Sequence, residues 1–305
     1  MLAGDARAIA RAISLVESET PEAASLIGQI FKRTGRAYLI GVTGAPGTGK
    51  STLVDALTAE IRRAGSTVGI IAVDPTSPFT GGAILGDRVR MTGHAADPGV
   101  YIRSMATRGH LGGLSRTTSD AALILDAAGK DFVVIETVGV GQDEVDIVRT
   151  ADVSIVVLVP GTGDDVQAIK AGIMEIADIF VVNKADREGA DRTAQAVAAN
   201  LSLHPFAANE WKPPIVRTEA NRGVGVDELW RQIGRFREHS AGQRAVRQRE
   251  RHRVRLRELL SRRLVERIEA GLPEGEIDRI AERVAARDLD PYSAVAGMIS
   301  SGLKA

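Results

Sequence analysis

The sequence predicts an α/β fold with a mostly parallel sheet, extended by helices at both ends of the chain. Two observations carry this prediction. Short apolar runs alternate with helical stretches between about residues 35 and 237, which is typical of parallel strands covered on both faces. The first of these runs leads directly into a glycine-rich loop, Gly44–Ser51, of the kind that holds phosphate groups.

The chain divides into three regions. Residues 1–34 predict two amphipathic helices separated at Thr20–Glu22, where a capping residue precedes a proline at the first helical position. Residues 35–237 form the α/β domain, and residues 238–305 are helical, with a turn at Leu272–Gly275 before a terminal helical pair. The expected strands are Ala37–Val42, Val68–Val73, Tyr101–Ser104, Phe132–Ile135, Ser154–Val159, Ile179–Val182 and Ile215–Thr218.

Composition excludes several classes of site. The 305 residues are 44% hydrophobic and include no cysteine, which rules out disulfides, thiolate metal sites and a cysteine nucleophile. No apolar run reaches transmembrane length, and the N-terminal residues lack the basic-then-apolar layout of a signal peptide. We therefore expect a cytoplasmic protein with no membrane segment.

Charge is balanced overall but unevenly distributed. The chain has 39 basic and 39 acidic residues, yet twelve arginines and only four glutamates fall between Arg235 and Ile268. This segment interleaves leucine and valine with the charges and has one aromatic residue, Phe236, which favours a solvated arm or a subunit interface. Nucleic-acid binding, which arginine-rich helices also support, is the less favoured interpretation.

The loop after the first strand has the pattern Gly44-x-x-x-x-Gly49-Lys50-Ser51. Its glycines let several backbone N–H groups point at one anion, Lys50 adds a charge near the β- and γ-phosphates, and the Ser51 hydroxyl can ligate Mg²⁺. The helix that follows turns its positive end toward the same phosphates. The chain is therefore predicted to bind a nucleoside triphosphate through Gly44, Ala45, Pro46, Gly47, Thr48, Gly49, Lys50, Ser51 and Thr52.

A second pattern indicates which base is bound. Asn183-Lys-Ala-Asp186 follows an apolar strand and matches the guanine pattern Asn-Lys-x-Asp. The Asp186 carboxylate can accept hydrogen bonds from the ring N1–H and the exocyclic amine of guanine, a donor pair that adenine lacks. The aliphatic stem of Lys184 can cover the base. Thr218-Glu219-Ala220 follows the last strand, where GTPases commonly present a backbone N–H to the guanine oxygen, although Glu219 departs from the usual serine or alanine.

Three carboxylates are candidates for the metal beside Ser51. Asp74 and Glu136 end two of the predicted strands, and Asp87 lies in a polar, glycine-rich loop. The carboxyl ends of parallel strands converge on the ligand crevice of such a sheet, and Mg²⁺ prefers oxygen ligands. An acid after the second strand also occurs in dinucleotide-binding folds, but the Lys50-Ser51 pair and the absence of Gly-x-Gly-x-x-Gly argue against hydride transfer.

The residues expected to control hydrolysis are unusual. Glu136-Thr-Val-Gly139 occupies the place of the Asp-x-x-Gly switch, whose glycine N–H senses the γ-phosphate. Val140 follows where Ras-like GTPases have the glutamine that positions water, and the nearest candidate is Gln142, so we expect slow intrinsic hydrolysis. A further polar loop, Pro160–Lys170, carries three switch candidates: Asp164, Gln167 and Lys170.

Taken in order, these motifs resemble the MeaB/ArgK-type GTPases of the SIMIBI class of P-loop proteins, a family that includes the human methylmalonic aciduria type A protein. The resemblance covers essentially the whole chain. It is carried by Gly44–Thr52, Val73-Asp-Pro-Thr-Ser-Pro78, Gly81-Gly-Ala-Ile-Leu-Gly-Asp-Arg88, Glu136-Thr-Val-Gly-Val-Gly-Gln142, Pro160-Gly-Thr-Gly-Asp-Asp-Val-Gln167 and Asn183–Asp186.

The resemblance implies a GTP-hydrolysing chaperone of an adenosylcobalamin-dependent mutase, methylmalonyl-CoA mutase or a close relative. Such proteins gate cofactor loading, protect the mutase from inactivation and form homodimers through helical C-terminal arms. By position, Lys50, Ser51, Asp74, Asp87 and Glu136 match the family's phosphate and Mg²⁺ residues.

The same resemblance assigns the base and the partner. Asn183 and Asp186 match the guanine readers of the family. Asp164, Gln167 and Lys170 fall in its third switch loop, through which the mutase is thought to stimulate hydrolysis.

Two other classes remain as alternatives. A nickel or cobalt metallochaperone GTPase would be expected to carry Cys or His ligands at metal spacing, but the chain has no cysteine and its five histidines are scattered. An ATP-using kinase or transport ATPase is disfavoured by the guanine pattern at Asn183–Asp186.

Overall fold

The computed structural model describes residues 1–2, 4–74, 92–94, 96–106, 116–137, 150–161 and 175–303. The chain divides into two compact units, Met1–Gly242 and Gln243–Ala305. The first unit holds the sheet and the helices packed on it, and the second is purely helical in its described residues.

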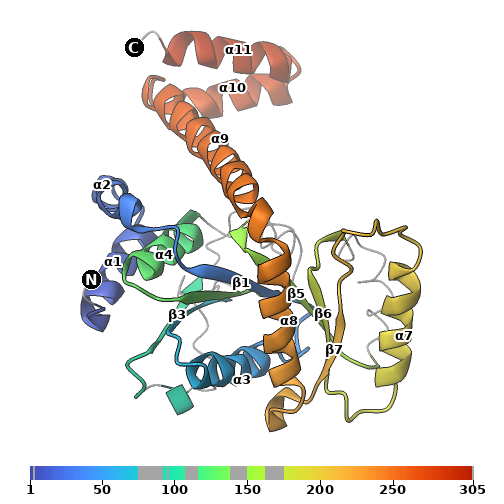
Figure 1. The fold of residues 1–305 in the computed structure, drawn as a ribbon. Coiled ribbons are helices and arrows are strands. Elements are labelled where there is room, and N and C mark those ends of the chain that lie inside the picture. The colour runs from blue at the N-terminus through green and yellow to red at the C-terminus, as the bar shows by residue number, and fades with distance from the viewer. Residues whose placement is uncertain are drawn as a thin grey trace. The chain divides into compact units, whose positions relative to one another are not determined.

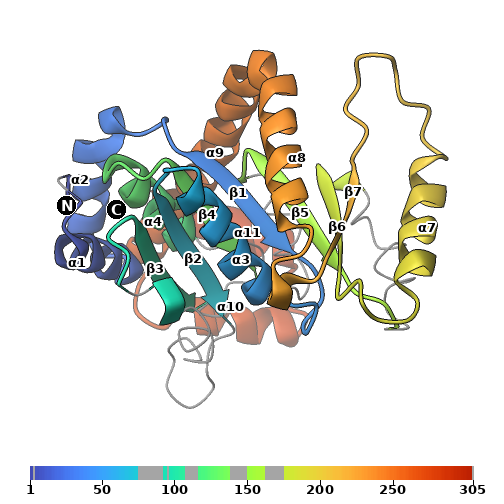
Figure 2. The ribbon, with the colours of Figure 1, turned by 60° about the horizontal axis from the view of Figure 1, so that its bottom comes forward.

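A parallel sheet forms the centre of the first unit (Figures 1 and 2). Its seven described strands follow the order β3-β2-β4-β1-β5-β6-β7, and each pair of neighbours runs parallel. The predicted α/β class and all seven expected strands are present, with ends shifted by at most two residues. The strands are β1 (Tyr38–Thr43), β2 (Val68–Asp74), β3 (Val100–Ala106), β4 (Phe132–Glu136), β5 (Val153–Leu158), β6 (Ile179–Asn183) and β7 (Ile215–Thr218).

Helices cover both faces of this sheet, so its central strands are buried on both sides. On one face, α3 (Lys50–Arg63) and α8 (Val226–His239) pack against alternate strand residues such as Ile155 and Val157. The intervening residues Val156 and Leu158 belong to a core with α7 (Ala190–Leu201) on the other face. The apolar runs in the sequence are continuous because neither face of these strands meets water.

The N-terminal helices belong to the same compact unit. Helix α1 (Ala6–Glu17) is capped by the Asp5 carboxylate, which accepts a 2.7 Å hydrogen bond from the Ala8 N–H. It packs with α2 (Pro21–Ile30) against α4 (Arg116–Ala127). Pro21 occupies the first turn of α2 as expected, but the Thr20 side chain makes no capping hydrogen bond, so that part of the expectation is wrong.

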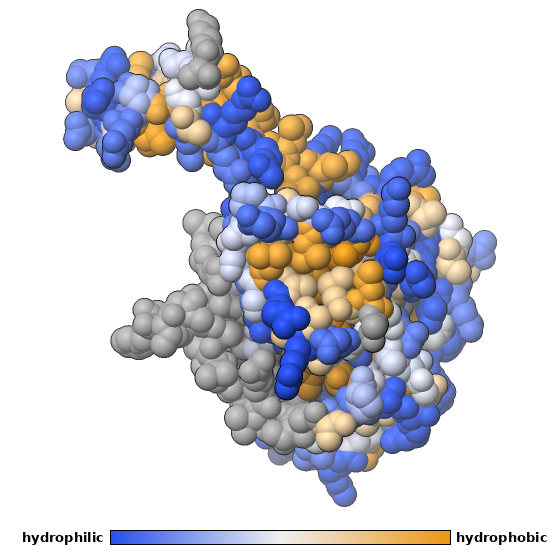
Figure 3. Space-filling view, turned by 90° about the vertical axis from the view of Figure 1, so that its left-hand side faces the viewer, coloured by the Kyte–Doolittle hydropathy of each residue, from blue (hydrophilic) through white to orange (hydrophobic). Residues whose placement is uncertain are grey.

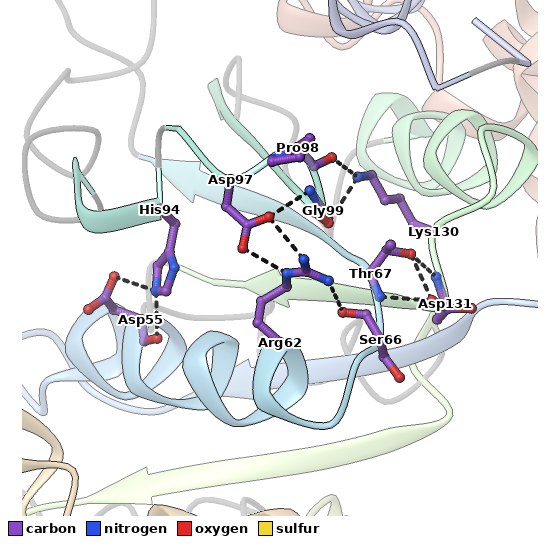
Figure 4. A network of polar contacts seen from close by, with 10 residues as sticks. All are labelled: Asp55, Arg62, Ser66, Thr67, His94, Asp97, Pro98, Gly99, Lys130 and Asp131. Carbon is purple, nitrogen blue, oxygen red and sulfur yellow. Dashed lines mark hydrogen bonds and ion pairs between the residues drawn. The ribbon is translucent and has the colours of Figure 1, made fainter.

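A polar network ties together the connections at the amino edge of the sheet (Figure 4). Arg62, near the end of α3, forms a bidentate ion pair with Asp97 at 2.8 and 3.0 Å, which lowers the pKa of the Asp97 carboxyl. The same guanidinium donates to the Ser66 carbonyl, and the Asp131 carboxylate accepts from the Thr67 N–H, each at or below 2.8 Å. The network fixes where β2 and β3 begin.

The second unit consists of α9 (Arg244–Ala270), α10 (Glu276–Ala285) and α11 (Pro291–Gly302). The ends of α9 and α11 meet at two glycines: a Cβ on Gly271 would lie 2.2 Å from the Gly302 carbonyl oxygen, and one on Gly302 would lie 2.4 Å from the Ile268 oxygen. Among the described helices of the chain, none is both long and apolar enough to cross a membrane.

Asp126, at the end of α4, binds the backbone just before β1, and replacing it tests how much this contact stabilises the fold. It is 6% exposed, and its carboxylate accepts hydrogen bonds from the backbone N–H groups of Gly35, Arg36 and Ala37 at 2.5, 3.2 and 3.0 Å. We expect Asp126→Ala to lower the free energy of unfolding by about 2–4 kcal/mol, because three backbone donors lose a charged acceptor. Urea-induced unfolding of the nucleotide-free protein measures the change.

The matched control is Asp191→Ala, which removes an exposed carboxylate paired with Arg217. Its expected effect is below about 1 kcal/mol, because exposed ion pairs contribute little. Equal losses in the two variants would contradict the role of Asp126.

Candidate functional site

The loop between β1 and α3 is shaped by glycines that no other residue could replace without rearrangement. Gly44, Gly47 and Gly49 have φ angles of 141°, 80° and 89°. A Cβ on Gly44 would lie 2.2 Å from the Val157 carbonyl oxygen of β5, and one on Gly49 would lie 2.5 Å from Asn183 Nδ2. The loop is therefore seated directly against the carboxyl ends of the neighbouring strands.

Lys50, the first residue of α3, turns its side chain back into this loop. Its ammonium donates hydrogen bonds to the carbonyl oxygens of Gly44 and Ala45 at 2.8 and 3.2 Å, and the residue is 6% exposed. The Thr48 hydroxyl donates to the same Ala45 oxygen at 2.9 Å. A buried cation enclosed by a curled backbone at a helix N-terminus is the arrangement that attracts a phosphate.

Ser51 and Glu136 lie together beside the loop. The Ser51 hydroxyl donates a 2.6 Å hydrogen bond to Glu136 Oε1, and both residues are buried. Strand pairing explains the meeting, because Glu136 at the end of β4 is in register with Val42 near the end of β1. A hydroxyl and a carboxylate oxygen side by side are ligands of the type that Mg²⁺ prefers.

The other acidic candidates are only partly described. Asp74 is the last residue of β2, at the same edge of the sheet, where Ala72 is in register with Glu136. The side chain of Asp74 and the whole of Asp87 lie outside the described residues. The same holds for the switch candidates Gly139, Gln142, Asp164, Gln167 and Lys170.

Asn183, the last residue of β6, joins two other segments of the chain through its side-chain amide. Its Nδ2 donates to the Thr48 carbonyl at 2.8 Å. Its Oδ1 accepts from the Thr218 hydroxyl at 3.0 Å and from the Ala220 N–H at 3.1 Å. The residue is 2% exposed, so this amide works as a buried brace between the phosphate loop and the segment after β7.

Lys184 and Asp186 follow Asn183 in the loop after β6. Lys184 has a φ of 56°, and its ammonium donates a 2.8 Å hydrogen bond to the Gly47 carbonyl, so its stem runs alongside the phosphate loop. The Asp186 side chain is exposed.

The segment after β7 makes its own backbone contacts. The Glu219 N–H donates to the Val224 carbonyl at 3.0 Å, and the Glu219 carboxylate pairs with Arg222. Both backbone N–H groups at Glu219 and Ala220 therefore already have acceptors within the protein.

Sequence reasoning missed two contributors to this site. The Thr137 hydroxyl donates to the Thr43 hydroxyl at 2.9 Å, and both side chains are buried at the strand ends next to Ser51 and Glu136. A threonine within two residues after each of two predicted strands was the available signal. The role of the Thr48 carbonyl as the acceptor for Asn183 could not have been found, because 135 positions separate the two residues.

Comparison with known proteins identifies relatives across most of the chain. Residues 9–272 match the family described as methylmalonyl Co-A mutase-associated GTPase MeaB. GTPase ArgK of Escherichia coli is 41% identical over 239 residues, covering 75% of this chain and 72% of ArgK. The mouse methylmalonic aciduria type A homolog, a mitochondrial protein, is 32% identical over 285 residues, covering 87% of this chain and 69% of its own length.

Solved structures show the same architecture. An LAO/AO transport system kinase superposes with a TM-score of 0.73 at 27% identity, covering all of this chain and 95% of that structure. HypB from Helicobacter pylori, in complex with nickel, gives a TM-score of 0.51 at 18% identity over 70% of this chain and 93% of its own, a likeness of fold alone.

The residues that match the family include the glycine-shaped loop with its enclosed lysine and the Asn-Lys-x-Asp segment held against that loop. The chain belongs to the MeaB family of GTPases.

Proposed function

We propose that this GTPase assists an adenosylcobalamin-dependent acyl-CoA mutase of the methylmalonyl-CoA mutase type, gating the loading of its cofactor and protecting it from inactivation. The observation that carries the proposal is the family match over residues 9–272, since the family is described by its association with that mutase. The name of the mouse relative, methylmalonic aciduria type A homolog, points to the same metabolic step.

The phosphates are assigned to the residues from Gly44 to Thr52. The curled backbone and the N-terminus of α3 supply N–H donors, and Lys50 supplies the positive charge. In the structure the Lys50 ammonium lies on two loop carbonyls, so a bound phosphate would compete for it at short range. The buried position strengthens this attraction because little water screens it.

Magnesium is assigned to Ser51 and Glu136, with Asp74 and Asp87 as further ligands. The 2.6 Å approach of the Ser51 hydroxyl to Glu136 supports a metal site of oxygen donors at this point. When bound, Mg²⁺ neutralises charge on the β- and γ-phosphate oxygens. Ser51, at the start of α3, and Glu136, at the end of β4, already lie within hydrogen-bond distance of each other, which would reduce the cost of ordering them around a metal.

The base is assigned to Asn183, Lys184 and Asp186, with Thr218, Glu219 and Ala220 closing the pocket. Asn183 and Lys184 both contact the phosphate loop, so the base site and the phosphate site are held at a fixed separation. The exposed Asp186 carboxylate is placed on the same segment and would accept from the N1–H and amine of guanine.

Hydrolysis is assigned to the segments that follow β4 and β5. Val140 stands after Gly139, where a water-positioning glutamine is common, so we propose that turnover is slow until the mutase completes the site. Gln142, Asp164, Gln167 and Lys170 are the residues through which the partner would act.

We further propose that the helical unit forms a homodimer. Leu256, Leu260 and Leu264 recur every four residues along α9 and are 67%, 61% and 43% exposed. Tyr292, Val295 and Ile299 on α11 are exposed as well, and hydrophobic residues are visible on the surface of this unit at the upper left of Figure 3. A second copy of the chain would cover this apolar surface.

Two alternative functions have weaker support. The transport system kinase that resembles this chain raises the possibility of ATP use, and the nucleotide experiment below decides it. The likeness to nickel-bound HypB is one of fold alone. Among the described residues, no group of three or more His, Cys, Asp or Glu side chains is arranged to hold a metal cargo.

Replacing Asp186 by Asn tests the guanine assignment. We expect Asp186→Asn to weaken GTP binding by about 100-fold or more and to favour xanthosine triphosphate, because a carboxamide can donate to the xanthine O2 while accepting from N1–H. Binding of the two nucleotides and of ATP is measured by calorimetry. Lys50→Ala should lose GTP binding, and comparable turnover of ATP and GTP by the unaltered chain would contradict guanine specificity.

Co-purification tests whether a mutase is the partner of this protein. The full chain, loaded with GDP or a non-hydrolysable GTP analogue, is expected to retain a methylmalonyl-CoA mutase and to hydrolyse GTP at least about ten-fold faster in its presence. Lys50→Ala should abolish the acceleration. Absence of a complex in every nucleotide state would refute the chaperone proposal while leaving the GTPase assignment intact.

Light scattering tests the dimer. The double variant Leu256→Asp/Leu260→Asp should raise the dimer dissociation constant by at least about ten-fold, because it places charges in an apolar interface. Leu203→Asp, which alters an 81% exposed leucine in the first unit, is the matched control and should leave the mass unchanged. A monomeric unaltered chain, or equal loss in both variants, would overturn the proposal.

A further inference from the structure

A cavity of about 560 Å³ opens at the amino edge of the sheet, away from the phosphate loop. It is enclosed by the segment before β1, the turn between α4 and β4, and α8. Its volume falls within the range of small-molecule sites. Because β1 is six residues long, roughly 20 Å of strand separates its two ends, so this cavity is distinct from the nucleotide site.

Positive charge dominates the wall of this cavity. Its lining includes four cationic side chains and two carboxylates: Arg33, Arg36, Lys130 and Arg237, with Asp126 and Asp131. Asp126 accepts from three backbone N–H groups, and Asp131 accepts from the Thr67 N–H and hydroxyl, each at 2.8 Å. Both carboxylates thus hold backbone groups, and Asp131 also lies close enough to Lys130 and Arg237 for their charges to help lower the pKa of its carboxyl, after the hydrogen bonds from Thr67. None of the three arginines forms an ion pair with another residue in the described ranges.

Lys130 contributes charge rather than a contacting group. Its ammonium donates to the Gly99 and Pro98 carbonyls at 3.0 and 3.5 Å, and the residue is only 8% exposed (Figure 4). Burial lowers the pKa of this amine. An anion bound nearby would favour the charged form of this amine. Because the ammonium already donates to two carbonyl groups, the direct contacts with a ligand fall to the arginines.

Aromatic rings hold one of these arginines in position. The Arg237 guanidinium lies over the rings of Tyr38 and Phe132, 5.2 and 5.7 Å from their centroids. Trp230, about two turns of α8 earlier and also in the lining, packs edge-on against Phe132 with centroids 5.1 Å apart. The cavity therefore combines an oriented guanidinium with a half-buried indole, the pair of groups that suits an anion attached to a planar ring.

We infer that this cavity is a second ligand site, which binds a small phosphate-bearing molecule with a planar ring. Arg33, Arg36 and Arg237 contact the phosphate, and Trp230 contacts the ring. Arginine suits this role because its planar fork matches phosphate oxygens and its charge is permanent. The site is independent of the proposed mutase partner.

Calorimetry on the full chain saturated with GDP and Mg²⁺ tests the site, because the phosphate loop is then occupied. Pyrophosphate probes the anion contacts alone, and ADP adds a ring. We expect both to bind, ADP more tightly, with affinities that fall as salt is raised. Arg36→Gln/Arg237→Gln should weaken both by at least about ten-fold while GDP affinity stays unchanged.

The control is Arg192→Gln, an exposed arginine on α7 that should leave binding unaltered. If the double variant does not fold, the fluorescence of Trp230 in a Trp211→Phe background reports occupancy, and a change on adding ADP supports the site. The inference is overturned if neither probe binds the GDP-loaded chain, or if Arg192→Gln weakens binding equally. Binding of a hexaglutamate peptide but of neither probe would also overturn it, in favour of an acidic protein segment.

Discussion

The side-chain amide of Asn183 is the contact on which the proposed nucleotide site depends. It ties the phosphate loop, the end of β6 and the segment after β7 into one buried assembly. The loop can approach so closely only because Gly49 has no side chain, since a Cβ there would lie 2.5 Å from this amide. The proposed phosphate site and the proposed base site therefore belong to a single structure, built from segments more than 130 residues apart.

The strand register of the sheet determines which side chains lie next to this assembly. Register places Glu136 beside Val42, which brings a carboxylate from one strand end to the serine at the start of α3. The opposite edge is organised by other means, with Arg62, Asp97 and Asp131 fixing the turns where strands begin. Helix α8 runs along the sheet between these edges, from just after the Thr218–Ala220 segment to Arg237 at the cavity. The carboxyl and amino edges of the sheet are thus both contacted by α8, but each edge has its own proposed binding site.

The sequence predicts the parts of this fold that obey local rules. Strands appear as apolar runs because both faces are buried, and the phosphate loop is visible because its positive φ angles demand glycine. Contacts between distant segments leave no such trace. Asp126 resembles any acid at the end of a helix, and nothing local shows that it binds the backbone before β1. The same holds for the Thr43–Thr137 pair and for the cavity, which exist only once the strands are side by side.

The contact between Gly271 and Gly302 makes the last turn of α11 part of the architecture of the helical unit. Each glycine lies so close to the opposing backbone that neither position has room for a methyl group. The two glycines therefore hold α11 to α9 by close backbone contact. Even an alanine at either position would force the two helices apart, and a truncation before Gly302 would remove the contact. Tags and truncations in this protein are therefore better placed away from these two glycines.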